Sequence, residues 1–405
     1  MPHLVTRRLA PLGALVVLAL AGCAAPAVPA APPTDAPADT HGEIAGAAEL
    51  AEPALGLTSI GPDGRVSHLD LLDETTADLG TVRVPAAMHS DGRFLFAADA
   101  GGVSIVDSGV WTWDHVDHFH YYRADARVLG DVEGEGVATV ATSNSSTTGG
   151  TGVFFPTSGE AVLLDTQALS EGEVVELFRL ETTPGAGIVA PAGSFAAVAA
   201  GDAVTLHSAD GAEVGASTPC VEPAGTITTR VGAVIGCRDG AVLVTVADES
   251  PVVETIPYPA GTTAPRATVF ANREGRPSVA AVAGEAGVWL LDTRERTWTL
   301  LPTPEPVVQA TAVDDADANL LALTADGRVL VLDGETGALR TSSPALVGAS
   351  LAAGQPVSLI ADQQRAYVNG PSEGRMWEID FADGARVARE FTPAQVPLFV
   401  AETGR

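Results

Sequence analysis

Three of the eight histidines in this 405-residue chain lie within six positions, at His115, His118 and His120. Two aspartates, Asp114 and Asp117, are interleaved with them. Neutral imidazoles and carboxylates are ligands for Zn²⁺, which binds about four of them in a tetrahedron. A metal-bound histidine usually donates its second ring N–H to a carboxylate, and the neighbouring aspartates offer such a partner. The segment therefore predicts a metal site, although Cu²⁺ and Ni²⁺ accept similar ligands.

The spacing of the three histidines determines which of them can share a face. Side chains two positions apart point the same way in an extended strand, so His118 and His120 are expected to lie together. His115 lies three positions before His118 and needs a bend or bulge to join them. The alternative interpretation is a solvated, aromatic-rich loop in which the histidines cluster without binding a metal.

The elements that must position these residues form a repeat that begins after residue 50. A short apolar strand, a glycine-containing turn and a strand of alternating apolar residues recur eight times, roughly 40 to 57 residues apart. Residues 319–324 and 328–333 show the pattern, whereas a Ser/Thr/Gly-rich insertion separates the third pair, 137–142 and 161–165. No long stretch has the 3.6-residue period of a helix. We predict an all-β fold, a single β-propeller of about eight four-stranded antiparallel blades, with seven blades as the alternative.

The predicted propeller suggests how the remaining ligands reach the histidines. The histidine segment follows the second strand pair, where the chain leaves a strand for a longer connection. His89 precedes the same strand pair, so His89 or Asp117 is predicted as the fourth ligand. Asp114 is predicted to orient a ligand ring without binding the metal itself. A final strand at residues 397–402 is expected to pair with the first strands and close the ring.

Residues 1–22 have the pattern of a lipoprotein signal peptide. The basic pair Arg7-Arg8 precedes an apolar run that is too short to span a membrane. The run ends in Leu-Ala-Gly before Cys23, which resembles the lipobox at which bacterial lipoproteins are cut and acylated. Residues 23–50 are rich in Ala and Pro and predict a flexible tether, so the propeller domain is expected at 51–405. We therefore expect an extracytoplasmic protein, lipid-anchored to the outer face of the bacterial cytoplasmic membrane.

Composition narrows the possible partners. The formal net charge is −29, which excludes a nucleic-acid-binding role because such proteins need a basic surface. Besides Cys23 the chain has two cysteines, Cys220 and Cys237. An even pair in an exported chain predicts a disulfide, and a thiolate metal site is the alternative.

Several motifs resemble the periplasmic zinc metallochaperones of the Azt type. The specific part is residues 106–111 (V-D-S-G-V-W) followed by 114–123 (D-H-V-D-H-F-H-Y-Y-R). Two further elements of that family have counterparts here. One is the N-terminal segment from His41 to Glu43, and the other is the cysteine pair, with G-C-R-D-G at 236–240. The resemblance covers most of residues 41–405. One departure is at 221–225, where the family has a His-Gly-Glu element and this chain has V-E-P-A-G.

The resemblance implies a function and partners. Members of that family are propellers that hand Zn²⁺ to the solute-binding protein of a zinc ABC transporter. It implies a non-enzymatic zinc donor, with His41 as a possible mobile ligand, and we expect a monomer. The missing His-Gly-Glu element leaves the affinity or the number of sites open.

Two other function classes are compatible with a propeller. A metal-dependent hydrolase would gather histidines and carboxylates from several blades, whereas here the histidines lie in one segment. A scaffold would bind another protein or the cell wall through one face. The fold by itself does not separate these alternatives from metal transfer.

Overall fold

The structure is a computed structural model that describes residues 42–115 and 118–405. The chain separates into a unit of residues 1–40, outside the described residues, and a unit of residues 41–405. The signal peptide, Cys23, His41 and Asp117 therefore lie outside the described residues. Among the described residues, no helix is long and apolar enough to cross a membrane.

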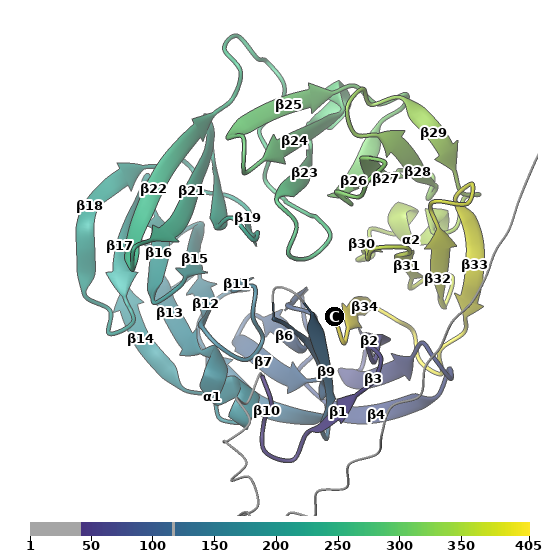
Figure 1. Ribbon diagram of the computed structural model, residues 1–405, viewed down its shortest axis with the longest axis horizontal. Coiled ribbons are helices and arrows are strands. Elements are labelled where there is room, and N and C mark those ends of the chain that lie inside the picture. Colours follow the sequence, from purple (N-terminus) through teal and green to yellow (C-terminus); the bar gives the residue numbers. More distant parts are fainter. Residues whose placement is uncertain (1–41, 116–117) are drawn as a thin grey trace, which may run out of the picture. The chain divides into compact units, whose positions relative to one another are not determined.

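Eight antiparallel sheets of the second unit follow one another around a common centre, as Figure 1 shows. Blade one contains β34 (Phe399–Thr403), β2 (Gly56–Ile60), β3 (Arg65–Asp70) and β4 (Thr76–Thr81). Blade two contains β5 (Ala87–Ser90), β6 (Phe94–Asp99), β7 (Gly102–Asp107) and β10 (Arg127–Glu133). Blade three contains β11 (Thr139–Thr142), β12 (Gly150–Phe155), β13 (Glu160–Asp165) and β14 (Glu176–Glu181). Blade four contains β15 (Gly187–Ala192), β16 (Phe195–Ala200), β17 (Ala203–Ser208) and β18 (Glu213–Pro219).

The second half of the ring repeats this arrangement. Blade five contains β19 (Thr226–Thr228), β20 (Ala233–Cys237), β21 (Gly240–Ala247) and β22 (Ser250–Pro257). Blade six contains β23 (Ser278–Val282), β24 (Val288–Asp292) and β25 (Thr297–Leu301). Blade seven contains β26 (Val307–Ala312), β27 (Asn319–Thr324), β28 (Val329–Asp333) and β29 (Leu339–Ser342). Blade eight contains β30 (Leu359–Ala361), β31 (Ala366–Gly370), β32 (Arg375–Asp380) and β33 (Arg386–Phe391). The helical elements are α1 (Thr166–Glu171), α2 (Gly348–Ala352) and the 3₁₀ turn Gly284–Ala286.

The predicted β-propeller is confirmed, and eight of its sheets are blades. The core lies between successive sheets, because the middle strands are apolar on both faces and pack against their neighbours. Phe96 and Ile105 of blade two, for example, belong to the same buried cluster as Val153 and Val162 of blade three. The predicted closure is also confirmed, because β34 pairs with β2 in antiparallel register, Phe399 opposite Ile60.

Three details differ from the sequence-based prediction. The third pair was expected to enclose an insertion, but that segment contains β12, a fully buried strand. The glycines of β12 lack the side-chain pattern of a strand, so the sequence did not predict it. Gly152 is needed because a Cβ there would lie 1.8 Å from the Val189 carbonyl oxygen of the next blade. Blade six has three strands, and a single bridge from Ala271 to Ala280 takes the place of a fourth.

The third difference concerns the tether, which was expected to extend to residue 50. The structure places strand β1 (Ala48–Leu50) within this stretch. It pairs in antiparallel register with β9 (Phe119–Arg123), which also pairs with β8 (Val110–Asp114). These strands form a ninth, three-stranded sheet outside the blades.

The predicted disulfide is present between Cys220 and Cys237, whose Cα atoms are 5.1 Å apart. Cys220 follows the last strand of blade four, and Cys237 ends β20 of blade five. Both residues are buried in the apolar cluster between these two blades. The bridge therefore joins adjacent blades.

We predict that replacing both cysteines with Ser lowers the free energy of unfolding by about 3 kcal/mol, because the bridge closes a short loop and restricts the unfolded chain. The measurement is urea denaturation of the wild type and the double variant. Wild type treated with reductant serves as the control and should match the variant. Coincident unfolding curves for oxidised wild type and the variant would contradict the prediction.

Candidate metal centre

The histidine segment forms a β-hairpin inserted into blade two. Strands β8 and β9 leave the blade after β7, and the chain returns to it at β10. The backbone N–H of His115 donates to the carbonyl oxygen of His118 over 2.9 Å, which turns the chain at the tip. This is the bend that the spacing of His115 required.

The hairpin is fixed to blade two at its base. Arg93 donates to both carboxylate oxygens of Asp107, over 2.9 and 2.7 Å, and both side chains are fully buried. The guanidinium also lies 4.0 Å from the centre of the ring of Trp111, the second residue of β8. Asp107 accepts a further bond from the N–H of Gly109. One ion pair thus fixes both the chain reversal before β8 and the ring at its start.

The tip of the hairpin brings the three imidazole rings together. The ring of His118 lies 4.8 Å from that of His115 and 4.7 Å from that of His120, between centroids. The Nε2 atoms of His118 and His120 are 2.9 Å apart. The predicted shared face of His118 and His120 is therefore confirmed. Trp113 packs against the rings of His115 and His120, at 5.1 and 6.0 Å.

A carboxylate that the sequence did not single out orients one of these rings. Glu49 of β1 accepts a hydrogen bond from His120 Nδ1 over 2.7 Å. This bond leaves Nε2 of the neutral ring with its lone pair, directed toward Nε2 of His118. Glu49 thus orients the ring of His120, whereas the role expected of Asp114, which ends β8, stays a prediction. Sequence reasoning missed Glu49 because it lies in the Ala/Pro-rich stretch and meets His120 only through the β1–β9 pairing.

The start of the described chain packs against the same hairpin. The Trp111 indole N–H donates to the carbonyl oxygen of Gly42 over 3.1 Å. Gly42 has a φ of +70°, and a Cβ there would lie 2.4 Å from Cδ1 of Trp113. Only glycine fits both constraints, so the lead segment is held directly against the aromatic residues beneath the histidines.

His89 does not lie with the hairpin histidines. It belongs to β5, where its Nε2 is 3.1 Å from the hydroxyl of Thr142 in the next blade. It lines a cavity of about 230 Å³ that the hairpin does not border. Burial lowers the pKa of His89 to about 4, so the ring is neutral at physiological pH. This corrects the expectation that His89 is the fourth ligand, because closeness in sequence to the second strand pair places it on the opposite edge of the blade.

The remaining two histidines of the described residues have structural surroundings. His68 bonds to the hydroxyl of Thr58 at 2.9 Å, and His207 contacts Thr205 and the carbonyl oxygen of Gly211. Burial lowers the pKa of His68. We infer from these contacts that both histidines have structural roles.

The donor set fits a metal in part. Two imidazole nitrogens converge, and a third ring stacks beside them. Within residues 42–115 and 118–405, no three His, Cys, Asp or Glu side chains converge in a ready-made metal geometry. The three-histidine site therefore stays a prediction. Asp117 and His41 lie outside the described residues and stay predictions.

The comparisons with known proteins agree with this architecture. No protein-family model and no curated protein matches the chain. Among solved structures, the chain is similar to dihydro-heme d1 dehydrogenase NirN in complex with DHE, with a TM-score of 0.53 and 16% identity over 88% of this chain and 76% of that one. The shared class is the β-propeller.

A more extensive similarity is to AztD from Citrobacter koseri. Apo AztD superposes with a TM-score of 0.73 and 19% identity, over 87% of this chain and 98% of that one. A second structure of AztD from Citrobacter koseri gives 0.74 and 18%, over 87% and 99%. The chain therefore has an AztD-like fold.

We predict that Glu49→Gln lowers the affinity for Zn²⁺ about tenfold, because partners that orient ligand rings contribute 10- to 100-fold to metal affinity. The amide keeps the shape of the side chain but is a weaker, uncharged acceptor for His120 Nδ1–H. The measurement is a competitive titration with a zinc-selective chelator. Glu52→Gln, an exposed carboxylate in the same segment, is the matched control and should leave the affinity unchanged. Equal losses in both variants would show that general negative charge matters and not the bond to His120.

Proposed function

We propose that this protein binds Zn²⁺ outside the cytoplasm at the histidine hairpin and delivers it to the solute-binding protein of a zinc ABC transporter. The observation that carries the proposal is the convergence of His118 and His120, with Nε2 atoms 2.9 Å apart and the second ring held by Glu49. The resemblance of the hairpin motif to Azt-type metallochaperones and the AztD-like fold support it. In this proposal the protein binds and transfers the ion without catalysing a reaction.

The position of the hairpin suits transfer to another protein. His118 is exposed and His120 is partly exposed, so a partner can approach the ligands from solvent. Imidazoles are borderline ligands without thiolate, and they hold zinc while still allowing exchange with competing ligands. A hydrolase would instead need ligands and a base gathered around a substrate, whereas these histidines all belong to one hairpin.

The remaining ligands are also proposed. His115 joins the set when its ring turns away from His118, and Asp117 or His41 completes it. Support for His41 comes from Gly42, the next residue, which is packed against Trp113 and bonded to Trp111. The lead segment therefore begins beside the rings that lie beneath the histidines.

We predict that His118→Ala weakens Zn²⁺ binding at least tenfold, because it removes a ligand, and even loss of a residue that supports a ligand costs that much. A competitive titration with a zinc-selective chelator measures the change. His207→Ala is the control, since His207 lies in blade four with its own hydrogen bonds, and its affinity should equal that of wild type. Equal affinity of His118→Ala and wild type would overturn the metal site and the transfer function with it.

Attachment to the membrane is proposed through Cys23. We predict that Cys23→Ser releases the protein from the membrane fraction or leaves its signal peptide uncleaved, because the acylated residue is lost. Cell fractionation with immunoblotting measures both effects, and Cys220→Ser, which leaves the lipobox intact, is the control. Normal cleavage together with membrane retention of Cys23→Ser would contradict lipid attachment.

A further inference from the structure

A large cavity borders the hairpin. Its volume is about 840 Å³, which is within the range of small-molecule sites. The chain has no lysine, so its 22 cationic side chains are all arginines, and six of them line this cavity. The six are Arg230, Arg273, Arg276, Arg365, Arg389 and Arg405.

The charge of the cavity differs from that of the chain as a whole. Five acidic side chains also line it: Asp114, Glu274, Asp362, Glu378 and Glu402. Six cations less five acids give a formal charge of +1, whereas the whole chain carries −29. Burial raises the pKa of Glu402 to about 8, and the neighbouring charge of Arg405 opposes this shift.

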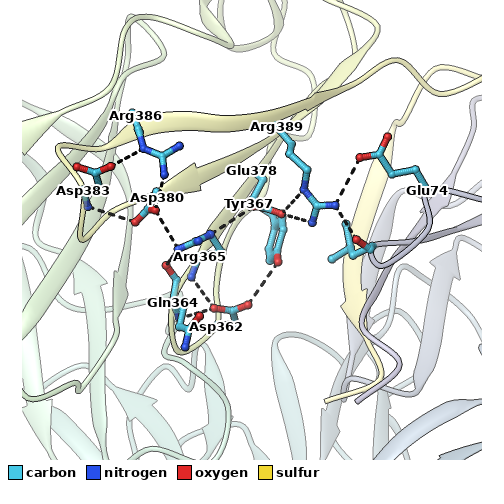
Figure 2. A network of polar contacts seen from close by, with 11 residues as sticks. Glu74, Asp362, Gln364, Arg365, Tyr367, Glu378, Asp380, Asp383, Arg386 and Arg389 are labelled. Carbon is cyan, nitrogen blue, oxygen red and sulfur yellow. Dashed lines mark hydrogen bonds and ion pairs between the residues drawn. The ribbon is translucent and has the colours of Figure 1, made fainter. Parts of the chain in front are cut away.

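Four of the six arginines are already paired with carboxylates. Arg389 and Arg365 bind Glu378, and Arg365 also binds Asp380, in the network that Figure 2 shows. Arg276 pairs with Asp314 at 3.3 Å, outside that network. Arg405 lies 2.8 Å from Glu274 and 2.9 Å from Glu402. These side chains already have carboxylate partners in or beside the wall of the cavity.

Arg230 and Arg273 lack such partners. Arg230 Nε donates to the carbonyl oxygen of Gly275 over 2.7 Å, and Arg273 contacts only the carbonyl oxygen of Asp314, at 3.4 Å. The Nε of Arg273 is buried without a hydrogen-bond partner. Burial and the charge of Arg276 lower the pKa of Arg273, and the carboxylates of Asp314, Asp315 and Asp362, which lie beyond ion-pair distance, oppose this shift.

An arginine without a carboxylate at ion-pair distance is uncommon in the described residues. Of the 20 arginines in the described residues, 17 lie within ion-pair distance of a carboxylate, and the exceptions are Arg230, Arg273 and Arg294. Two of the three exceptions line the same cavity, and Arg230 bonds to the backbone of Gly275, two positions after Arg273. In a protein with 51 acidic residues, two arginines of one cavity that have no carboxylate within ion-pair distance indicate a place for an external anion.

The rest of the lining indicates what kind of anion fits. Trp113, Phe119 and Tyr121 of the hairpin and the highly exposed Leu72 supply apolar surface, and Asn144 and Ser145 supply neutral polar groups. A multiply charged phosphate would be repelled by the acids in the wall, whereas a single carboxylate matches the small positive charge. Guanidinium groups bind carboxylates through paired, charge-assisted hydrogen bonds.

We propose that this cavity binds an organic monocarboxylate with an apolar body, whose carboxylate is held by Arg230 and Arg273. The aromatic side chains of the hairpin contact the apolar body. Binding needs no metal, so this site is independent of the proposed zinc site, although the two share the hairpin as a common wall.

The experiment is isothermal titration of the full chain, with EDTA present and at low ionic strength, using 3-phenylpropionate as the probe. We expect saturable one-to-one binding with a Kd below about 1 mM, the lower end of specific affinity. The uncharged analogue 3-phenylpropionamide should not bind measurably. Equal binding of acid and amide, or no binding of the acid in this range, would overturn the proposal.

Matched variants then test the two arginines. Arg230→Gln and Arg273→Gln should each weaken binding of the acid about tenfold, as expected for loss of a charged hydrogen-bond donor. Arg294→Gln is the control, because Arg294 also lacks a carboxylate partner but lies outside the cavity, and it should bind like wild type. If a Gln variant does not fold, Arg273→Lys replaces it. This variant keeps the positive charge but loses the planar guanidinium that forms paired hydrogen bonds, so it should bind the acid with intermediate affinity. Wild-type affinity in the folded variants, or an equal loss in Arg294→Gln, would refute the assignment.

Discussion

The closure of the ring is the constraint on which the rest of the structure depends. Strand β34 comes from the end of the chain and hydrogen-bonds to β2, so blade one contains the first and the last strand of the propeller. The segment after β34 then reaches blade two, where Gly404 N–H donates to the carbonyl oxygen of Gly92. The Gly404 carbonyl oxygen accepts a bond from the hydroxyl of Thr112 in the hairpin over 2.8 Å. Ring closure therefore also supports the strand that carries the histidines.

The hairpin depends on a second, local interaction between two buried charges. Arg93 directly precedes β6, Asp107 ends the adjacent strand β7, and both side chains are about 1% exposed. Removing one partner of such a pair usually costs about 3–5 kcal/mol, because the other charge is left buried without compensation. Here the pair also holds Trp111 and the turn at Gly109, so the exposed tip rests on a rigid base. A site for transfer needs this combination, since its ligands must face solvent yet stay close together.

Two faces of the same hairpin have different chemistry. At its tip, imidazoles and Glu49 offer borderline metal ligands. Along its flank, Phe119 and Tyr121 border a cavity whose formal charge is opposite to that of the chain. An occupant of the cavity would contact the strands that set the positions of His118 and His120. The physical link between the two proposed sites is therefore a shared two-stranded element, not a distant pathway.

The sequence by itself determined the local features. Alternating apolar residues and glycine turns predicted the strands, and their repetition predicted the propeller. The spacing of His118 and His120 predicted their common face. All three features depend on the periodicity of an extended chain. The pair Cys220–Cys237 followed from composition.

Only the tertiary structure decided which residues meet across the fold. Glu49 reaches His120 because β1 pairs with β9, and His89 lies away from the hairpin because β5 is at the other edge of blade two. Arg230 and Arg273 meet at one cavity although 43 positions (273 − 230) separate them in sequence. Such contacts depend on strand pairing and ring closure, which local periodicity does not encode.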